Sequence, residues 1–256
     1  MRGESPPSLN PWLLPTALDQ SPTCRRWRLC PWPLTGTLLA LMDGPIVWLL
    51  AITACYLLGA VPFAFLVGVL CGVDLRKVGT GNVGAGNLTR SVGVPAGMVA
   101  ALLDGLKGLV PVLVFNNMGV GPAVVSVSGL AVVAGHNWSV FMKGRSGRGL
   151  APSSGVLAGV DFSMLVWPAG WAAAGWKIGG GLGGFIGWSS LPVLAAVFRK
   201  PAPVAVATLG LSVLMIVRRM QGNPGHEPGV RAALYRAVFD RDPGEELASA
   251  EEPVGH

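Results

Sequence analysis

Charged residues are scarce in this chain of 256 residues, where they make up only 12% of the sequence. A soluble domain usually carries about 25% charged residues, so the shortage excludes an ordinary water-soluble fold. Hydrophobic residues reach 51%, which indicates that much of the chain faces lipid. Acidic residues are fewer than basic ones, 13 against 19, and the formal net charge is +6. In a membrane protein this excess is typical of cytoplasmic loops and anionic partners, and the aromatic residues form no stripe with the basic ones that would indicate nucleic-acid binding.

Cysteine is also rare, and its four positions form no recognisable ligand pattern. Cys24, Cys30, Cys55 and Cys71 include no Cys-x-x-Cys pair, and no histidine lies close enough to complete a zinc pattern. We therefore expect no metal site and no cofactor. Cys55 and Cys71 are interpreted as small hydrophobic residues.

Long apolar runs dominate the chain from residue 46 onward. They cover Ile46 to Leu70, 94–115, Gly119 to Met142 and most of 150–217. A helix needs about 20 apolar residues to cross a bilayer, and these runs are too long and too unbroken for the strands of a barrel. The sequence therefore predicts an all-α, polytopic membrane bundle of seven transmembrane helices, with six as the alternative. Pro62 is expected to kink the first helix.

Composition divides the chain into three parts. Residues 1–44, rich in Pro, Ser and Trp, are expected to be a poorly ordered or interfacial extension. Residues 45–219 form the predicted membrane domain. Residues 220–256 form a polar tail that is expected to be disordered past about Gln221, apart from a short helix that Ala232 to Phe239 could form. The abrupt change in composition suggests that translation starts at Met42.

Basic residues predict the orientation of the bundle. Two loops separated by two helices are rich in them, and both are expected on the cytoplasmic side; they carry Arg76, Lys77 and Arg90, and Lys143, Arg145 and Arg148. The protein is thus expected in the cell inner (plasma) membrane with these loops facing the cytoplasm. With seven helices, Arg199-Lys200 falls on the outer side, which counts against this arrangement.

The first basic loop, Asp74 to Arg90, is rich in glycine. Glycines allow tight turns whose backbone N–H groups bind anions, and Arg90 is a cation suited to phosphate. Candidate contacts to a phosphate are Thr80, Gly81, Asn82, Asn87 and Arg90. A flexible connecting loop is the alternative interpretation.

The second basic loop, Gly135 to Gly149, repeats the combination of glycines and cations and adds one histidine. Its candidate residues are His136, Arg145, Gly147, Arg148 and Gly149. Two such loops on one face predict a cationic pocket for a doubly charged phosphate.

Two further features lie within the apolar runs. Asp104 and Lys107 are three residues apart, so they share one helix face; ionisable residues in a membrane helix indicate function, with a structural ion pair as the alternative. The glycines at 179–184 and the segment Gly187 to Ser190 favour close helix packing.

Five short motifs in order resemble those of one family. They are Gly59-Ala-Val-Pro-Phe-Ala-Phe-Leu66, Asp74 to Arg90, Leu103 to Gly108, Gly135 to Phe141, and Arg145 to Pro152. Together they are similar to the bacterial acyl-phosphate-dependent glycerol-3-phosphate acyltransferases, the PlsY family. The departures are Gly86 and Pro152 in place of Thr, Ser139 in place of Pro, Ser146 in place of Gly, and Arg145 and Arg148 in place of Lys.

This resemblance implies transfer of a fatty acyl group from acyl phosphate to the sn-1 hydroxyl of glycerol 3-phosphate, without acyl carrier protein or coenzyme A. For this reaction we expect catalytic roles for His136, Asn82, Arg90 and Lys107. His136 is the candidate general base near neutral pH, and the substrate phosphate is the alternative base. We expect phosphate binding or substrate orientation by Thr80, Gly81, Asn87, Arg145, Gly147, Arg148, Gly149 and Ser189.

Two other interpretations stay open. An anion or solute permease would also suit interrupted helices carrying an Asp104–Lys107 pair, although the sequence has no paired half-repeat. An acyltransferase-like protein that binds lipid phosphate with impaired catalysis would suit the motif departures. The His-x-x-x-x-Asp pair of the other large acyltransferase family is absent, because Phe141 lies five residues after His136.

Overall fold

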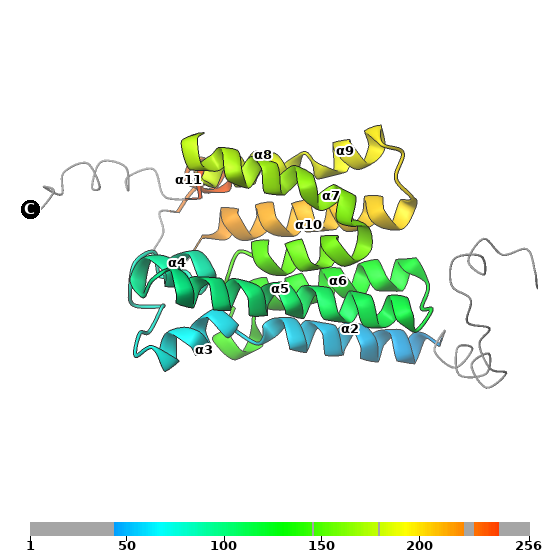
Figure 1. The fold of residues 1–256 in the computed structure, drawn as a ribbon, viewed down its shortest axis with the longest axis horizontal. Helices are drawn as coiled ribbons and strands as arrows, with labels where there is room; N and C mark the ends of the chain where they lie inside the picture. The colour runs from blue at the N-terminus through cyan, green and yellow to red at the C-terminus, as the bar shows by residue number, and fades with distance from the viewer. Residues whose placement is uncertain (1–43, 145, 179, 223–227, 241–256) are drawn as a thin grey trace, which may run out of the picture. The chain divides into compact units, whose positions relative to one another are not determined.

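The structure, a computed structural model, describes residues 44–144, 146–178, 180–222 and 228–240. Every regular element in these ranges is a helix (Figure 1). The expectations for residues 1–43, for Arg145 and for residues 241–256 lie outside the described ranges.

The first half of the bundle contains two long helices and one interrupted helix. Its elements are α2 (Pro45–Ala60), α3 (Phe63–Leu70), α4 (Ala85–Ser91), α5 (Val94–Asn117) and α6 (Pro122–Asn137), followed by the 3₁₀ turn η1 (Val140–Met142). The expected kink at Pro62 is confirmed, because α2 ends and α3 begins on either side of it. Pro62 has no N–H to continue the helical hydrogen bonds.

The second half begins after the second basic loop. Its elements are α7 (Leu150–Ile178), α8 (Gly180–Ser189), α9 (Leu191–Val197), α10 (Ala202–Gln221) and α11 (Val230–Phe239). The short helix predicted in the C-terminal tail is confirmed as α11. It packs against α10 and α8, so this part of the tail belongs to the folded bundle.

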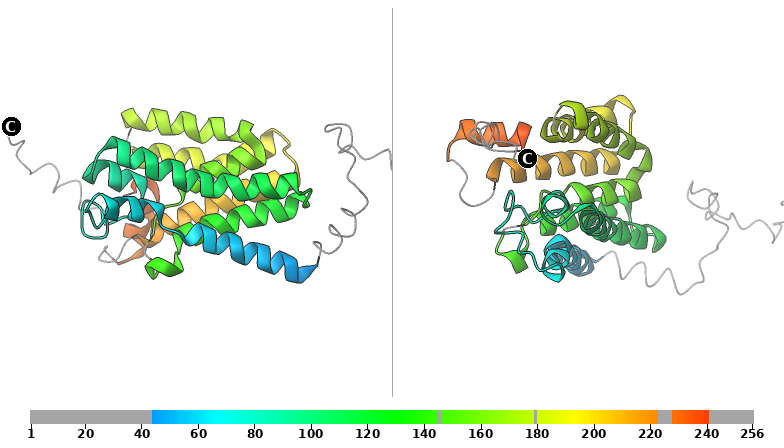
Figure 2. Two further views of the ribbon diagram at one scale, coloured as in Figure 1. Left: turned by 60° about the horizontal axis from the view of Figure 1, so that its bottom comes forward. Right: turned by 60° about the vertical axis from the view of Figure 1, so that its left-hand side comes forward.

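The helix α7 consists of two segments that meet at Asp161. The backbone there is non-helical, with φ −158° and ψ 98°. Before Asp161 the helix packs against α5, where a Cβ at Gly155 would lie 2.0 Å from the Gly105 carbonyl oxygen. After Asp161 the chain turns back and packs against α8, as Figures 1 and 2 show.

The apolar helices confirm a multi-pass membrane fold. Five helical segments are long and apolar enough to cross a membrane, namely Pro45–Leu70, Val94–Asn117, Pro122–Met142, Leu150–Gly175 and Ala202–Gln221, and Gly181–Val197 is a shorter apolar segment. Because α7 turns back at Asp161, it contributes two of the seven apolar segments that run along the bundle in the described ranges.

Glycines bring the helices into close contact. A Cβ at Gly59 would lie 2.0 Å from the Val132 carbonyl oxygen, and one at Gly135 would lie 2.0 Å from that of Tyr56. These two positions let α2 and α6 approach backbone to backbone. Gly183 and Gly187 both lie against Trp171: an added Cβ would be 2.5 Å from its carbonyl oxygen at Gly183 and 2.8 Å from its Cβ at Gly187. The packing role predicted for the later glycines is thus confirmed at these two positions.

Both basic loops lie at the end of the bundle where α4 and α11 lie (Figure 1). A small apolar cluster of Ala64, Leu75, Leu88 and Ala100 holds the first loop against α3 and α5. At the opposite end, Lys200 forms an ion pair of 2.7 Å with Asp161. One of the two basic residues that counted against the predicted orientation therefore has a carboxylate partner.

Candidate active site

A polar cavity of about 200 Å³ opens between the two basic loops. It is formed by the first loop and α4, the middle of α5, the end of α6, the start of α7 and the residue after α11. The lining residues are Asn82, Gly84, Ala85, Gly86, Asn87, Arg90, Asp104, His136, Arg148, Gly149, Leu150, Ala151 and Asp240. Six of the predicted site residues, from both loops, therefore meet at one place.

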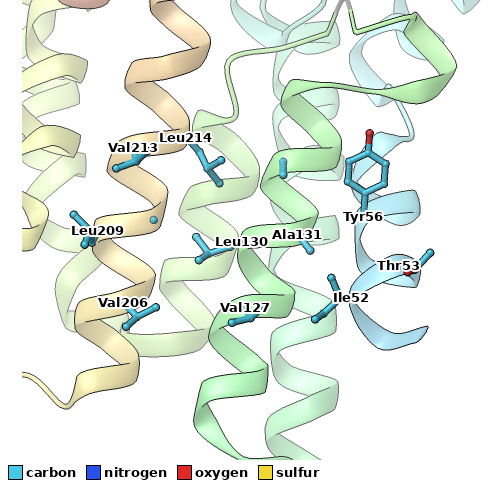
Figure 3. Close-up of a pocket in the computed structure, with 12 residues that line it drawn as sticks. Ile52, Thr53, Tyr56, Val127, Leu130, Ala131, Val206, Leu209, Val213 and Leu214 are labelled. Carbon is cyan, nitrogen blue, oxygen red and sulfur yellow. The ribbon is translucent and has the colours of Figure 1, made fainter. Parts of the chain in front are cut away.

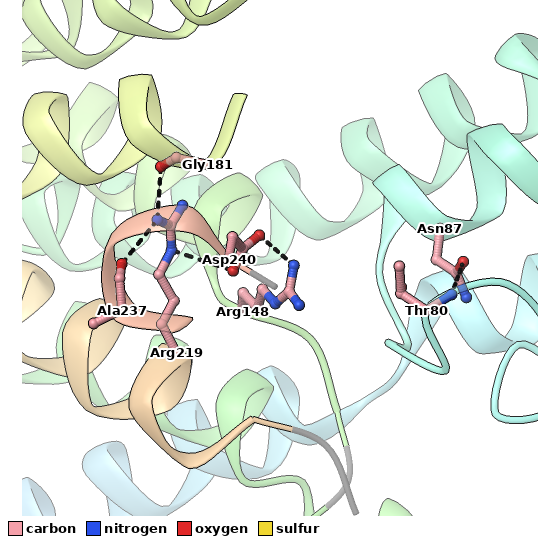
Figure 4. Close-up of polar contacts among 7 residues, drawn as sticks. All are labelled: Thr80, Asn87, Arg148, Gly181, Arg219, Ala237 and Asp240. Atoms are coloured by element: carbon pink, nitrogen blue, oxygen red, sulfur yellow. Dashed lines mark hydrogen bonds and ion pairs between the residues drawn. The ribbon is translucent and has the colours of Figure 1, made fainter. Parts of the chain in front are cut away.

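Asn87 gives the first loop its shape. Its buried amide donates to the carbonyl oxygens of Leu75 and Val78, at 3.2 and 3.0 Å, and its oxygen accepts the N–H of Thr80 at 3.1 Å (Figure 4). The amide is thereby occupied by the loop's own backbone. Asn87 lines the cavity, but its hydrogen bonds fix the turn around Gly79 and Gly81, both of which have positive φ.

Two side chains of the first loop offer polar groups to the cavity. Asn82 is buried, and its side-chain oxygen has no hydrogen-bond partner within the described residues. Arg90 lies in the last turn of α4 with an exposed side chain, and its guanidinium forms no ion pair or hydrogen bond with the described residues. A group that binds in the cavity can therefore use both.

A buried charged cluster lies under the cavity. Lys107 Nζ is 2.8 Å from Asp104 Oδ1 and donates to the Val61 carbonyl oxygen at 2.8 Å. His136 Nδ1 lies 3.6 Å from the same Asp104 oxygen, which is longer than a direct hydrogen bond. All three side chains are at least nine-tenths buried. Lys107 thus neutralises Asp104, and Asp104 faces the imidazole of His136.

Two glycines of the second loop allow it to pack on the end of α6. A Cβ at Gly147 would lie 2.2 Å from His136 Nε2, and one at Gly149, where φ is +76°, would lie 2.5 Å from Asn137 Oδ1. The loop backbone therefore fits directly against the imidazole ring, and only glycine leaves space for both contacts.

Arg218 fastens this loop to the bundle. Its guanidinium donates to the carbonyl oxygens of Asn137, Gly222 and Ser146, at 3.1, 2.7 and 2.8 Å. The side chain is buried at the end of α10. One residue therefore joins α10, the end of α6 and the second loop.

The neighbouring arginine holds the C-terminal helix. Arg219 donates to the carbonyl oxygens of Gly181 and Ala237, at 2.9 and 3.2 Å, and its Nε lies 3.5 Å from Asp240 Oδ1 (Figure 4). The other oxygen of Asp240 forms an ion pair with Arg148. A carboxylate from the tail thus lies between a predicted phosphate ligand and a buried arginine.

Several predicted site residues lie apart from the cavity. Thr80 and Gly81 are in the first loop but do not line it, and Lys107 reaches it only through Asp104. Ser189 lies at the end of α8 and is also absent from the lining. Their predicted roles stay untested, and Arg145 lies outside the described residues.

Sequence reasoning missed Arg218, Arg219 and Asp240. The signal that could have found the two arginines is their place at the end of an apolar run, where a buried arginine needs a carbonyl or anion partner. Asp240 lay in a tail with no distinctive pattern. Within the described ranges, His, Cys, Asp and Glu side chains form no group of three that could hold a metal ion.

An exposed ion pair lies in the first loop, outside the membrane segments. Arg76 donates to both carboxylate oxygens of Asp74, at 2.9 and 2.8 Å. The hydrogen bonds from Arg76 lower the pKa of Asp74 to about 2. The pair rigidifies the start of the loop without facing the cavity.

An apolar groove of about 740 Å³ lies between α2, α6 and α10 (Figure 3). Its lining includes Ile52, Tyr56, Val127, Leu130 and Leu209. Tyr56 also donates a hydrogen bond of 2.7 Å to the carbonyl oxygen of Trp138, close to His136 in the chain. The groove has the chemistry of a surface that accepts a hydrocarbon chain.

Comparisons with known proteins agree with this geometry. A family model described as glycerol-3-phosphate acyltransferase matches residues 49–224. Glycerol-3-phosphate acyltransferase 2 of Moorella thermoacetica is 34% identical over 198 residues, covering 73% of this chain and 100% of the relative. The chain is also similar to two crystal structures of PlsY, an integral membrane glycerol 3-phosphate acyltransferase. In both, the sequence identity is 30% and the match covers 98% of the PlsY chain. The glycerol 3-phosphate form has a TM-score of 0.65 and covers 78% of this chain; the lysophosphatidic acid form has a TM-score of 0.62 and covers 73%.

These matches extend over most of the membrane bundle and include both loops of the cavity. They favour an acyltransferase over the permease that the sequence left open. The chain is a multi-pass membrane protein that belongs to the glycerol-3-phosphate acyltransferase family of the PlsY type.

Proposed function

We propose that this protein transfers a fatty acyl group from acyl phosphate to the sn-1 hydroxyl of glycerol 3-phosphate, giving lysophosphatidic acid and inorganic phosphate. The observation that carries the proposal is the meeting of Arg90, Arg148, Asn82 and His136 in one small cavity. Two cations suit phosphate groups, and a buried histidine beside a carboxylate suits proton transfer.

The reaction requires little from the protein beyond binding and proton transfer. The sn-1 oxygen attacks the carbonyl carbon of the donor, the bond from that carbon to the phosphate oxygen breaks, and phosphate leaves with the electron pair. Arg90 and Arg148 counter the negative charge of the two phosphates, and Asn82 orients the reacting oxygens. Holding the hydroxyl beside an already activated carbonyl removes entropy from the barrier.

His136 is proposed to accept the hydroxyl proton. Lys107 neutralises Asp104, so the carboxylate that faces the ring leaves no unpaired buried charge. With Nδ1 toward Asp104, Nε2 is the nitrogen available as the base. It lies against Gly147, so the position of the second loop determines how the base meets the cavity.

Acyl phosphate is proposed as the donor, without acyl carrier protein or coenzyme A. The motifs shared with the acyl-phosphate-dependent enzymes support this donor, and the small cavity suits a phosphate leaving group. The apolar groove between α2, α6 and α10 suits the fatty chain. The lysophosphatidic acid form of PlsY supports the same product for this chain.

The cavity is proposed to face the cytoplasm from the cell inner (plasma) membrane. Its end of the bundle carries Arg76, Lys77, Arg90, Lys143 and Arg148, whereas the opposite end carries Arg199 and Lys200. Basic residues favour the cytoplasmic side. Lys200 is paired with Asp161, which leaves Arg199 as the exposed basic residue described at that end.

The test uses the purified protein in detergent with palmitoyl phosphate and glycerol 3-phosphate. We expect acceptor-dependent phosphate release and lysophosphatidic acid, and no product when acyl coenzyme A or acyl carrier protein replaces the donor. His136→Ala and Arg90→Ala should each lower turnover by roughly 10²- to 10⁴-fold. Lys77→Ala removes an exposed cation from the same loop and serves as the control, with turnover near that of the wild type.

Near-normal turnover in both His136→Ala and Arg90→Ala would overturn this site. Absence of acceptor-dependent release, together with solute uptake into liposomes, would instead support a permease.

A further inference from the structure

The C-terminal helix brings a carboxylate into the proposed phosphate site. Asp240 lines the cavity and forms an ion pair with Arg148, although it comes after residue 224, where the match to the family model ends. Carboxylate and phosphate are alternative partners for an arginine, because both accept its parallel N–H groups. Asp240 therefore occupies a position at which a substrate phosphate would be expected.

The position of Asp240 is fixed by a docked helix. A Cβ at Gly181 would lie 2.0 Å from the Phe239 carbonyl oxygen, so α11 contacts the start of α8 backbone to backbone. Arg219 binds the Ala237 carbonyl oxygen, and Arg236 donates to the Met220 carbonyl oxygen at 3.1 Å. These contacts hold α11 against α8 and α10 independently of Asp240.

The backbone at Asp240 turns its side chain into the cavity. Its φ is +65°, the left-handed conformation, and its N–H donates to the Arg236 carbonyl oxygen at 2.8 Å. One oxygen pairs with Arg148, and the other is buried without a hydrogen-bond partner within the described residues, 3.5 Å from Arg219 Nε. A single carboxylate thus bridges two arginines, as a bound phosphate would.

The two acidic residues in the cavity lining, Asp104 and Asp240, differ in the cation that neutralises them. Asp104 is neutralised by Lys107, so it does not compete for the arginines. Asp240 neutralises Arg148, which leaves Arg90 as the cavity cation that pairs with no carboxylate in the described part of the chain. A phosphate that binds Arg148 would lie beside a carboxylate of like charge, and the two would repel each other.

We propose that Asp240 is an internal anion that occupies the phosphate position at Arg148, and that a substrate phosphate must displace it in order to bind. The C-terminal helix thereby sets the apparent affinity of the enzyme for its phosphate substrates. This inference rests on the proposed function, because it takes the cavity as the phosphate site.

Asp240→Asn is the main test variant. Asparagine keeps the size of the side chain and tolerates positive φ, while it removes the negative charge. We expect the KM for the phosphate substrate that binds at Arg148, and the inhibition constant of inorganic phosphate, to fall by about tenfold. That factor corresponds to an ion pair that is closed about 90% of the time. The kcat should stay within about threefold, because Asp240 pairs with Arg148 and Arg219 and not with His136, the proposed base.

Asp161→Asn is the matched control. Its carboxylate has nearly the same exposure, 18% against 19%, and also pairs with one cation, but it lies at the opposite end of the bundle. This variant should leave KM and the inhibition constant within about twofold of the wild type. If Asp240→Asn does not fold, Asp240→Gly tests the same point, because glycine also adopts positive φ.

The outcomes separate the two proposals. An active wild type with unchanged or higher constants in Asp240→Asn would overturn the role of Asp240 and leave the acyltransferase standing. If the wild type showed no turnover, the acyltransferase proposal would fail. The role of Asp240 could then still be tested by measuring the binding of inorganic phosphate through the shift in the temperature of thermal unfolding. Tighter binding in Asp240→Asn but not in Asp161→Asn would support it, and equal binding in all three proteins would refute it.

Discussion

Replacing Gly147 with alanine tests whether the second loop and His136 work as one unit. The new Cβ would lie 2.2 Å from His136 Nε2, whereas ordinary contacts begin near 3.4 Å. The ring or the loop must therefore move by about 1.2 Å, the difference between these distances. The loop is held on both sides, by Arg218 at Ser146 and by the contact of Gly149 with Asn137, so we expect the ring to move.

A shift of about 1 Å in a reacting group can cost about 100-fold in rate, which corresponds to about 2.7 kcal/mol. We expect Gly147→Ala to lower kcat by about this factor in the phosphate-release assay. Its thermal unfolding should stay close to that of the wild type, because the loop lies outside the apolar core. Gly170→Ala is the control, since a Cβ there meets nothing within 4 Å. A kcat for Gly147→Ala within threefold of the wild type would refute the placement of His136 against the loop.

Three further predictions concern stability. Arg218→Lys should lower the free energy of unfolding by about 3 kcal/mol, because a single ammonium cannot replace a fork that binds three carbonyl oxygens; unchanged chemical unfolding would contradict this. Gly135→Ala should lower the free energy of unfolding by about 1–3 kcal/mol. Its Cβ would lie 2.0 Å from the Tyr56 carbonyl oxygen, so α2 and α6 would have to move apart. Thermal unfolding as stable as that of the wild type would exclude so close an approach.

The third stability prediction concerns pH. The pKa of Asp74 is lowered to about 2 from 3.8, so its ion pair stabilises the fold above about pH 4 and is lost as the pH falls through about 2. Asp74→Asn removes this dependence. The difference in Tm between the wild type and Asp74→Asn should be small and constant at neutral pH, because Arg76 and Asp74 are solvent-exposed, and it should vanish between about pH 4 and pH 2. A difference that persists at pH 2 would show that the ion pair is not its source.

Much of the fold could be predicted from hydropathy, because a bilayer leaves few options for an apolar run. The break at Pro62 follows from a missing N–H, and the packing at Gly183 and Gly187 follows from the small size of glycine. The apolar stretch 150–217 is interrupted at Asp161, but an acidic residue alone does not show that the chain reverses direction there. The pairing of Asp161 with Lys200 depends on a contact between residues far apart in the sequence.

The candidate site was predictable where the chemistry lies in local patterns. The glycine- and cation-rich loops pointed to Asn82, Arg90, His136 and Arg148, all of which line the cavity. The function of Asn87 within its own loop could not be read from the sequence, because an amide that binds phosphate and one that binds backbone look alike. Asp240 was missed because its role depends on where α11 packs.

The contact between Arg218 and the second loop also has a consequence for biosynthesis. Asp104 and His136 are synthesised and inserted early. Arg218, which anchors the second loop beside them, lies on α10, near the end of the membrane domain. Ser146 therefore lacks its partner until α10 has entered the membrane. A nascent or prematurely ended chain would hold a histidine and a carboxylate but no ordered loop above them. Activity should accordingly appear only in chains that have been synthesised past Arg218.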